Sequence, residues 1–208
     1  MRVRGFYGVI DVAGPPAREL ADRLILAGAQ VLQVRLKGAP ASVVLATARL
    51  VRELSSPAGV GLVVNDRLDV ALAAQADAVH LGQHDLPLSA ARAALAPVRG
   101  RLLVGISTHT PAQAEVAARA GADYLGFGPV FATTTKVNAE PAQGVDALAE
   151  AVQRAYPVPV VAIGGITPQR AEEVVRTGAA AACAISAVNS AEDVIEAARR
   201  IAEAFARR

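Results

Sequence analysis

The chain has 208 residues, of which 53% are hydrophobic and only 3% aromatic, and its formal net charge is +2. This length fits one large domain or two small ones, and the core has to be built from aliphatic side chains. The net charge is too small to favour nucleic acid as a partner, although the sequence pI is near 9.0.

The single cysteine, Cys183, lies within an apolar run. No disulfide can form within the chain, and a buried thiol suits a reducing compartment. The amino terminus shows no signal-peptide pattern, and no apolar run approaches the roughly 20 residues of a membrane span. We therefore expect a soluble cytoplasmic protein without a membrane partner.

Apolar runs alternate with helical patterns along the whole chain. The predicted strands are residues 6–11, 31–36, 60–64, 78–81, 102–106, 123–127, 159–163 and 180–185. The predicted helices are residues 15–27, 41–54, a short segment after Asp66, and residues 89–95, 111–119, 145–155, 168–176 and 191–205. A long loop, residues 128–144, separates the sixth strand from the sixth helix.

Eight strand–helix units predict an α/β protein. The strands read as continuous apolar runs, as in a parallel sheet covered on both faces. Small residues recur where helices lead into strands: AGAQ at 27–30, QADA at 75–78, AGAD at 120–123 and TGAA at 177–180. These features favour a single (β/α)8 TIM barrel over residues 1–208. The alternative, an open doubly wound sheet, would carry a glycine-rich turn after the first strand, which VAGPPA matches poorly.

Two carboxylates, Asp66 and Asp85, each follow the end of a predicted strand. The carboxyl ends of parallel strands meet at one edge, so both side chains could reach one ion. Hard oxygen donors beside a phosphate suit Mg²⁺, which keeps few protein ligands. The alternative is local: Asp66 caps the following helix and Asp85 begins a turn.

The second strand ends in alternating polar residues. Gln33, Arg35 and Lys37 share one face, while Val34 and Leu36 share the other. Polar groups on a strand are costly to bury unless they are paired. An amide and two cations at a barrel mouth suit an anionic, heterocyclic substrate; the alternative is an internal layer of salt bridges.

The later strand exits carry phosphate-binding signals. Ser107, Thr108 and Thr110 follow or end the fifth strand, where helix capping is the alternative role of the two threonines. A threonine run ending at Lys136 follows the sixth strand and can supply donors and a cation, unless it is only a surface loop. Glycines after the seventh strand, and the turn after the eighth, suit the phosphate site found in many barrels.

Together these segments resemble the thiamine-phosphate synthase family. The resemblance covers the first to the eighth strand and is carried by QVRLK, VNDRLDVALAAQADAVHLGQHDLP, VGISTHT, ADYLGFGPVFATTTK, PVVAIGGIT and AISAV. It implies a transferase that joins hydroxymethylpyrimidine diphosphate to a thiazole phosphate and releases pyrophosphate. One departure is Ala132, where the family often has proline.

The resemblance also implies roles for individual residues. Asp66 and Asp85 would bind Mg²⁺. The diphosphate and catalysis would depend on Arg35, Lys37, Asn65, Ser107 and Lys136. The aminopyrimidine would be bound by Gln33. The thiazole phosphate would be bound by Thr133, Thr135, Gly165, Ile185 and Ser186. His80 and His109 are expected to be structural or to shape the substrate site, and Cys183 to lie in the core. A homodimer is the assembly considered.

Two other functions stay open at this point. A related branch of the fold isomerises a thiazole carboxylate phosphate and lacks the full diphosphate set. A non-catalytic phosphate-binding barrel would need the last two strand exits but not Arg35, Asp66 or Asp85.

Overall fold

The computed structural model describes residues 1–11, 14–98, 102–133 and 140–207. Parallel strands form a closed barrel in sequence order, and the last strand pairs with the first. The strands are β1 (Gly5–Asp11), β2 (Val31–Arg35), β3 (Gly61–Asn65), β4 (Ala78–Leu81), β5 (Leu103–Thr108), β6 (Tyr124–Phe127), β7 (Val160–Ile163) and β8 (Ala181–Ala184). The predicted (β/α)8 barrel is confirmed, and the open sheet is wrong because β1 pairs with β8.

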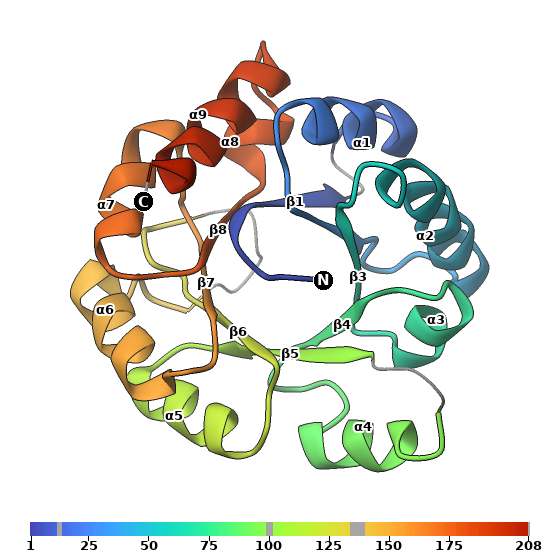
Figure 1. Cartoon of the computed structure of the whole chain (residues 1–208), viewed down its shortest axis with the longest axis horizontal. Helices are drawn as coiled ribbons and strands as arrows, with labels where there is room; N and C mark the ends of the chain where they lie inside the picture. The colour runs from blue at the N-terminus through green and yellow to red at the C-terminus, as the bar shows by residue number, and fades with distance from the viewer. Residues whose placement is uncertain (12–13, 99–101, 134–139, 208) are drawn as a thin grey trace.

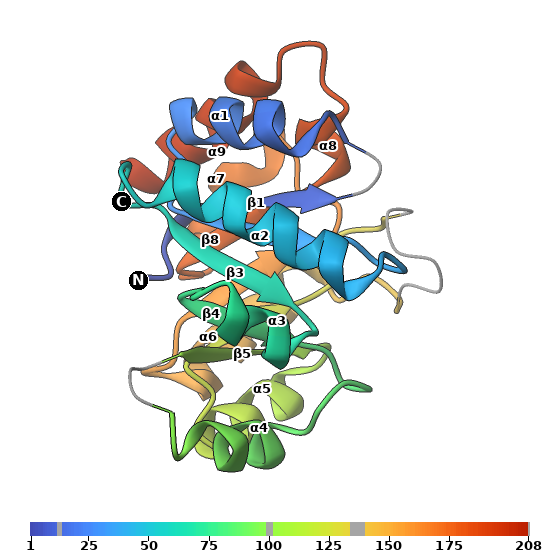
Figure 2. The ribbon, with the colours of Figure 1, turned by 90° about the vertical axis from the view of Figure 1, so that its right-hand side faces the viewer.

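Helices surround the barrel as an outer ring (Figure 1). They are α1 (Ala17–Leu26), α2 (Ala41–Ser55), α3 (Leu68–Ala73), α4 (Leu88–Leu95), α5 (Pro111–Arg119), α6 (Gly144–Ala155), the 3-10 helix η1 (Pro168–Arg170), α7 (Ala171–Arg176), α8 (Ser186–Asn189) and α9 (Val194–Ala206). Both chain ends lie at the side of the barrel where the strands begin (Figure 2). None of the helices in the described part of the chain is long and apolar enough to cross a membrane.

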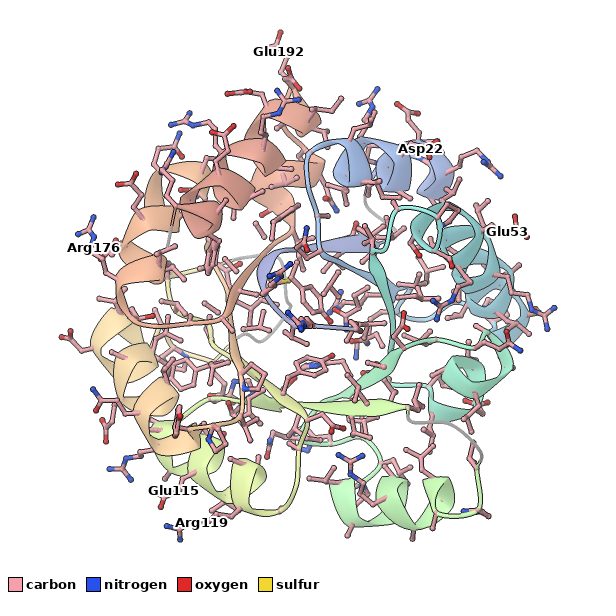
Figure 3. The ribbon with its side chains drawn as sticks, in the orientation of Figure 1. Asp22, Glu53, Glu115, Arg119, Arg176 and Glu192 are labelled. Atoms are coloured by element: carbon pink, nitrogen blue, oxygen red, sulfur yellow. The ribbon has the colours of Figure 1, made fainter. Side chains whose placement is uncertain are left out.

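Strand alternation divides the apolar residues between two layers. On β1, Phe6 and Ile10 pack in the large cluster between sheet and helices, whereas Tyr7 and Val9 belong to the smaller cluster inside the barrel. Charged side chains such as Glu53 project outward from the helices (Figure 3). The layer around the barrel is therefore mostly aliphatic, with Phe6 and Phe127 as its buried aromatic residues, while tyrosines fill part of the barrel interior.

The small-residue joins end helices as predicted. Gly28, Gly121 and Gly178 have φ values of +90°, +89° and +88°, a region in which glycine has no steric penalty. Gln75 takes the same left-handed conformation at the third join, with φ of +52°. These residues turn each chain segment from helix into strand.

Most element boundaries shift by one or two residues from the prediction, and three of the differences have a clear structural description. Strand β5 continues to Thr108, so Ser107 and Thr108 lie within the strand, where their backbones pair with β6. The seventh helix begins with the 3-10 turn η1. The last predicted helix begins three residues late, at Val194, because the Asp193 carboxylate accepts a hydrogen bond from the Glu196 N–H at 2.9 Å and caps it. The short helix α8, at Ser186–Asn189, was not predicted.

Candidate active site

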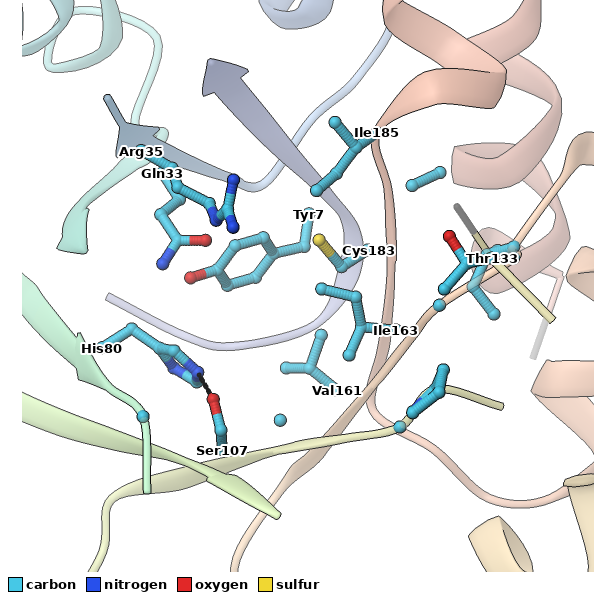
Figure 4. A pocket seen from close by; sticks show the side chains of 18 of the residues that line it. Tyr7, Gln33, Arg35, His80, Ser107, Thr133, Val161, Ile163, Cys183 and Ile185 are labelled. Carbon is cyan, nitrogen blue, oxygen red and sulfur yellow. Dashed lines mark hydrogen bonds between the residues drawn. The ribbon is translucent and has the colours of Figure 1, made fainter. Parts of the chain in front are cut away.

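A cavity of about 550 Å³ opens at the carboxyl ends of the strands (Figure 4). Every strand contributes at least one lining residue, from Tyr7 on β1 to Cys183 on β8. In a (β/α)8 barrel this face carries the active site, since the strand-to-helix loops converge on it.

The polar face of β2 points into this cavity. Gln33, Arg35 and Lys37 all line it, as the alternation predicted. Gln33 is only 5% exposed, and its Nε2 donates a hydrogen bond to Asn65 Oδ1 at 3.0 Å. Among the residues that the structure describes, Arg35 has no ion-pair partner. The predicted alternative of a closed salt-bridge layer therefore fails for Arg35, whose guanidinium remains available to an anion.

Lys37 instead pairs with a carboxylate at the exit of the neighbouring strand β3. Its Nζ lies 2.7 Å from Asp66 Oδ2, and the Asp66 side chain is also hydrogen bonded to Asp85. Asp85 Oδ2 accepts a hydrogen bond from the Gly82 N–H at 2.7 Å, so this residue does organise the local turn. Asp66 does not cap α3, whose N-cap is Arg67 and has no side-chain cap. The capping alternative is thus wrong for Asp66.

The electrostatics of the two carboxyl groups are unequal. Burial raises the pKa of Asp66 above its ordinary value, and Asp85 adds to the rise against the opposing effect of Lys37. Burial also acts to raise the pKa of Asp85, but hydrogen bonds from Asp66 and from the Gly82 N–H outweigh it and leave this pKa lowered. The pKa values of the two carboxyl groups are therefore shifted in opposite directions, as expected for carboxyl groups in contact.

Four hydrogen-bonded side chains cross the floor of the cavity. The Tyr7 and Tyr124 hydroxyls lie 3.3 Å apart, His80 Nδ1 lies 3.1 Å from the Tyr124 hydroxyl, and His80 Nε2 lies 3.0 Å from Ser107 Oγ. Burial lowers the pKa of His80 to about 4, so the imidazole is neutral near pH 7. Burial also raises the pKa of Tyr124, which keeps its phenol protonated.

The exits of β6 and β7 lie against each other. Gly165 has a φ of +62°, and a Cβ at this position would lie 2.6 Å from the Ala132 carbonyl oxygen and 2.8 Å from Phe131 Cβ. The Arg170 guanidinium stacks 4.4 Å from the Phe131 ring centroid and donates a hydrogen bond to the Gly165 carbonyl at 2.7 Å. Only glycine fits this turn, and Arg170 ties the two loops together.

The cavity brings together most of the residues predicted from the sequence. Those that line it are Gln33, Arg35, Lys37, Asn65, Asp66, Asp85, Ser107, Thr133, Gly165, Ile185 and Ser186. Thr135 and Lys136 lie outside the described residues. Thr108 also lines the cavity, but its hydroxyl donates to the Gly126 carbonyl, whereas Thr110 caps α5 by accepting from the Gln113 N–H. For Thr110 the capping alternative is confirmed.

Other lining residues were not assigned a function from the sequence. Tyr7 and Tyr124 are polar-tipped side chains on inward positions of apolar strands, which is the signal that could have identified them. Arg170 follows the predicted seventh strand exit by only a few residues. His109 donates from Nδ1 to the Gly128 carbonyl and joins two strand exits, in the structural role expected for it. Cys183 packs inside the barrel and burial raises its pKa to about 12.

The sequence matches the family model for thiamine monophosphate synthase over residues 7–188. A thiamine-phosphate synthase from Chloroflexus aurantiacus is 45% identical over 94% of this chain and 89% of that protein. Another from Methanocella arvoryzae is 49% identical over 88% of this chain and 84% of that protein.

One solved structure agrees with the sequence matches. The thiamine phosphate pyrophosphorylase from Pyrococcus furiosus superposes with a TM-score of 0.88 and 35% identity, covering 98% of this chain and 96% of that chain. Because the family model spans most of the chain, and relatives of comparable length share over 40% of their residues with it, the chain belongs to the thiamine monophosphate synthase family.

Proposed function

We propose that this enzyme condenses hydroxymethylpyrimidine diphosphate with hydroxyethylthiazole phosphate, giving thiamine phosphate and pyrophosphate. The observation that carries the proposal is the meeting of Arg35 and Lys37 with the carboxyl pair Asp66 and Asp85 in one cavity. Cations and oxygen ligands side by side suit a diphosphate that is bound together with a divalent cation.

The pyrimidine end of the first substrate is assigned to Gln33. Its amide is nearly buried and is oriented by Asn65, so its carbonyl oxygen is directed and can accept a hydrogen bond from an exocyclic amine. Arg35, Lys37, Asn65 and Ser107 surround the adjoining space and would bind the diphosphate. Lys136 joins them on the sequence resemblance alone.

Asp66 and Asp85 would hold Mg²⁺. Among the residues described, no group of three or more His, Cys, Asp or Glu side chains is arranged to hold a metal ion. Two contacting carboxyl groups nevertheless fit Mg²⁺, which takes one or two protein carboxylates and completes its shell with water and substrate phosphates. When bound, the ion supplies charge neutralisation for the diphosphate. Lys37 would then exchange its present partner, Asp66, for a phosphate oxygen.

The thiazole phosphate is assigned to the other side of the cavity. Gly165 and the start of α8 at Ile185 and Ser186 present backbone groups, and Thr133 adds a hydroxyl. Thr135 belongs to this set by resemblance. Arg170 would act here by holding the Gly165 turn in place.

The chemistry needs charge neutralisation rather than a protein nucleophile. The carbon–oxygen bond to the diphosphate breaks with its electron pair leaving on the diphosphate, and the aminopyrimidine stabilises the cation left on the methylene carbon. The thiazole nitrogen then donates its lone pair to that carbon. Arg35 and Lys37 stabilise the developing charge, and preorganised charge is commonly the largest catalytic contribution. Cys183 does not compete as a nucleophile, because its raised pKa keeps the thiol protonated.

The two rival functions fit less well. Neither a thiazole tautomerase nor a phosphate-binding barrel needs Arg35 together with Asn65, Asp66 and Asp85, yet all four line this cavity. The test is to offer the purified protein the thiazole carboxylate phosphate alone, and then the two synthase substrates with Mg²⁺. Synthesis without isomerisation supports the proposal, and isomerisation alone would replace it. Cytoplasmic location and a homodimer stay predictions.

A further inference from the structure

Tyr7, Tyr124, His80 and Ser107 form the hydrogen-bonded row on the cavity floor. The row depends on two glycines of the barrel. In the barrel register, His80 on β4 lies beside Gly105 on β5, and Gly105 lies beside Tyr124 on β6. The two side chains meet over Gly105, where a Cβ would fall 2.1 Å from Tyr124 Cζ. Gly126 makes similar room for the imidazole, because a Cβ there would lie 3.1 Å from His80 Cε1. Two inward-facing glycines thus leave space for His80 and Tyr124 to touch.

The hydrogens around His80 allow only two arrangements. Each of the four groups carries a single hydrogen that can be shared, since His80 is a neutral imidazole between two hydroxyls. In one arrangement Tyr7 donates to Tyr124, Tyr124 to His80 Nδ1, and His80 Nε2–H to Ser107. In the other both bonds of His80 are reversed: Nδ1–H donates to Tyr124, and the Ser107 hydroxyl donates to Nε2.

Only the first arrangement frees the Ser107 hydrogen. Ser107 lines the cavity together with Arg35 and Lys37, so an anion there is the available acceptor. An anion cannot donate, which excludes the reversed arrangement whenever Ser107 contacts it. The Tyr124 hydroxyl sets the tautomer, because it is the group that can donate to Nδ1.

We propose that Tyr124 and His80 are positioning residues, which hold His80 in its Nε2–H tautomer and so aim the Ser107 hydrogen at the anionic group of the substrate. This inference deepens the proposed function and rests on it for the identity of the anion. Tyr124 and His80 act on the anion through Ser107.

The competing explanation is structural. Buried tyrosine hydroxyls usually find a partner, and Tyr124 is fully buried while Tyr7 is 3% exposed. If the row served only to satisfy these hydroxyls, loss of either one would be a matter of stability. Under the proposal the two tyrosines differ, because Tyr124 keeps its own hydrogen for His80 when Tyr7 is gone. Tyr7→Phe is therefore the matched control for Tyr124→Phe.

The first measurement is the tautomer itself, from nitrogen-15 spectra of histidine-labelled protein with pyrophosphate and Mg²⁺. The chain has three histidines, so His84→Gln and His109→Gln assign the signals. We expect His80 to carry its hydrogen on Nε2 in wild type and in Tyr7→Phe, and to shift toward Nδ1–H in Tyr124→Phe. A hydrogen on Nδ1 in the wild-type complex would overturn the inference, as would a wild type that does not bind pyrophosphate.

The second measurement is a double-mutant cycle on pyrophosphate affinity. Ser107→Ala should weaken binding roughly tenfold, the effect of losing one hydrogen bond to a charged group. Tyr124→Phe should weaken it by up to the same factor in wild type, but by less than about twofold in the Ser107→Ala background. If the affinity loss of the double variant equals the product of the two single losses, Tyr124 acts independently of Ser107. That result would overturn the inference.

These outcomes are separable from the proposed function. A protein that shows the predicted tautomer and cycle but makes no thiamine phosphate would retain the positioning role and lose the proposed reaction. A protein that makes thiamine phosphate while His80 carries its hydrogen on Nδ1 would retain the reaction and lose the positioning role.

Discussion

Lys37 Nζ lies 2.7 Å from Asp66 Oδ2, and the same carboxyl group is hydrogen bonded to Asp85. The cation and one carboxylate of the proposed diphosphate site therefore neutralise each other in the free protein. Substrate binding has to separate them, with Lys37 turning to phosphate and the carboxyl pair to a cation. Each charged residue of this site can therefore be tested by a single substitution.

Replacing Asp85 with asparagine keeps the size of the side chain and removes one negative charge. We expect Asp85→Asn to lower turnover by roughly 10²-fold or more at limiting Mg²⁺, as for loss of one preorganised electrostatic partner. Binding of the thiazole phosphate should change little, because its proposed ligands come from β6, β7 and β8. Steady-state rates over a Mg²⁺ series check this, with the exposed Asp69→Asn as control. If Asp85→Asn has wild-type turnover at limiting Mg²⁺, Asp85 is not a ligand of the metal.

His80 predicts a dependence of stability on pH. Its pKa falls from 6.5 to about 4 because burial disfavours the imidazolium. As the pH falls through 6.5, His80 of the unfolded chain binds a proton while the buried His80 of the folded chain stays neutral. The free energy of unfolding therefore decreases progressively down to about pH 4. The loss should reach about 3 kcal/mol for this one group.

Denaturant unfolding between pH 7 and 4 measures that loss as the difference between wild type and His80→Gln. The exposed His84→Gln variant serves as the control for replacing a histidine. Equal pH dependence in wild type and His80→Gln would show that His80 titrates normally in the fold.

Gly165 is predicted to be required for binding thiazole phosphate because it has no side chain. Gly165→Ala would place a Cβ 2.6 Å from the Ala132 carbonyl oxygen and push the β7 exit away from the β6 loop. We expect the affinity for thiazole phosphate to fall roughly tenfold or more, the value of a hydrogen bond to a charged group.

The control for this variant is Gly121→Ala, at the opposite end of the barrel. Gly121 also has a positive φ, of +89°, but a Cβ there would meet nothing within 4 Å. Both variants should lose about 1 kcal/mol of stability from backbone strain, and Gly165→Ala should lose more because of its clash. Only Gly165→Ala should lose affinity by calorimetry. A similar affinity in both would mean that the β7 turn does not bind the phosphate.

Lys136 separates the synthase from its rivals. If it neutralises charge on the leaving pyrophosphate, Lys136→Ala should lower turnover by roughly 10²–10³-fold while the fold and thiazole phosphate binding persist. A surface lysine would matter by only a few tenths of a kcal/mol. Product formation under single-turnover conditions distinguishes a catalytic lysine from a solvated one. A wild-type rate in Lys136→Ala would mean that Lys136 has no role in the reaction.

Much of the site followed from strand periodicity. Side chains alternate along a strand, so placing Gln33 in the barrel also placed Arg35 and Lys37 there. The carboxyl ends of parallel strands share one side, so Asp66 and Asp85 met as predicted. These inferences need only local pattern and the eightfold repeat.

The remaining features depend on contacts between distant segments. Tyr7 and Tyr124 are 117 positions apart and meet inside the barrel, where Gly105 on the strand beside β6 leaves room for the Tyr124 ring. The stacking of Arg170 on Phe131 likewise joins two separate strand exits. The prediction that β5 stops at Ile106 was wrong, since pairing with β6 carries the strand two residues further. No local pattern contains these contacts.

The most direct test of the proposed reaction is to quantify both products in one incubation of the purified protein with hydroxymethylpyrimidine diphosphate, hydroxyethylthiazole phosphate and Mg²⁺. Mass spectrometry measures thiamine phosphate, and a coupled phosphate assay measures pyrophosphate. We predict equal amounts of the two products, formed only when both substrates are present and sharply reduced without Mg²⁺. Absence of thiamine phosphate, with or without release of pyrophosphate, would contradict the proposed synthase activity.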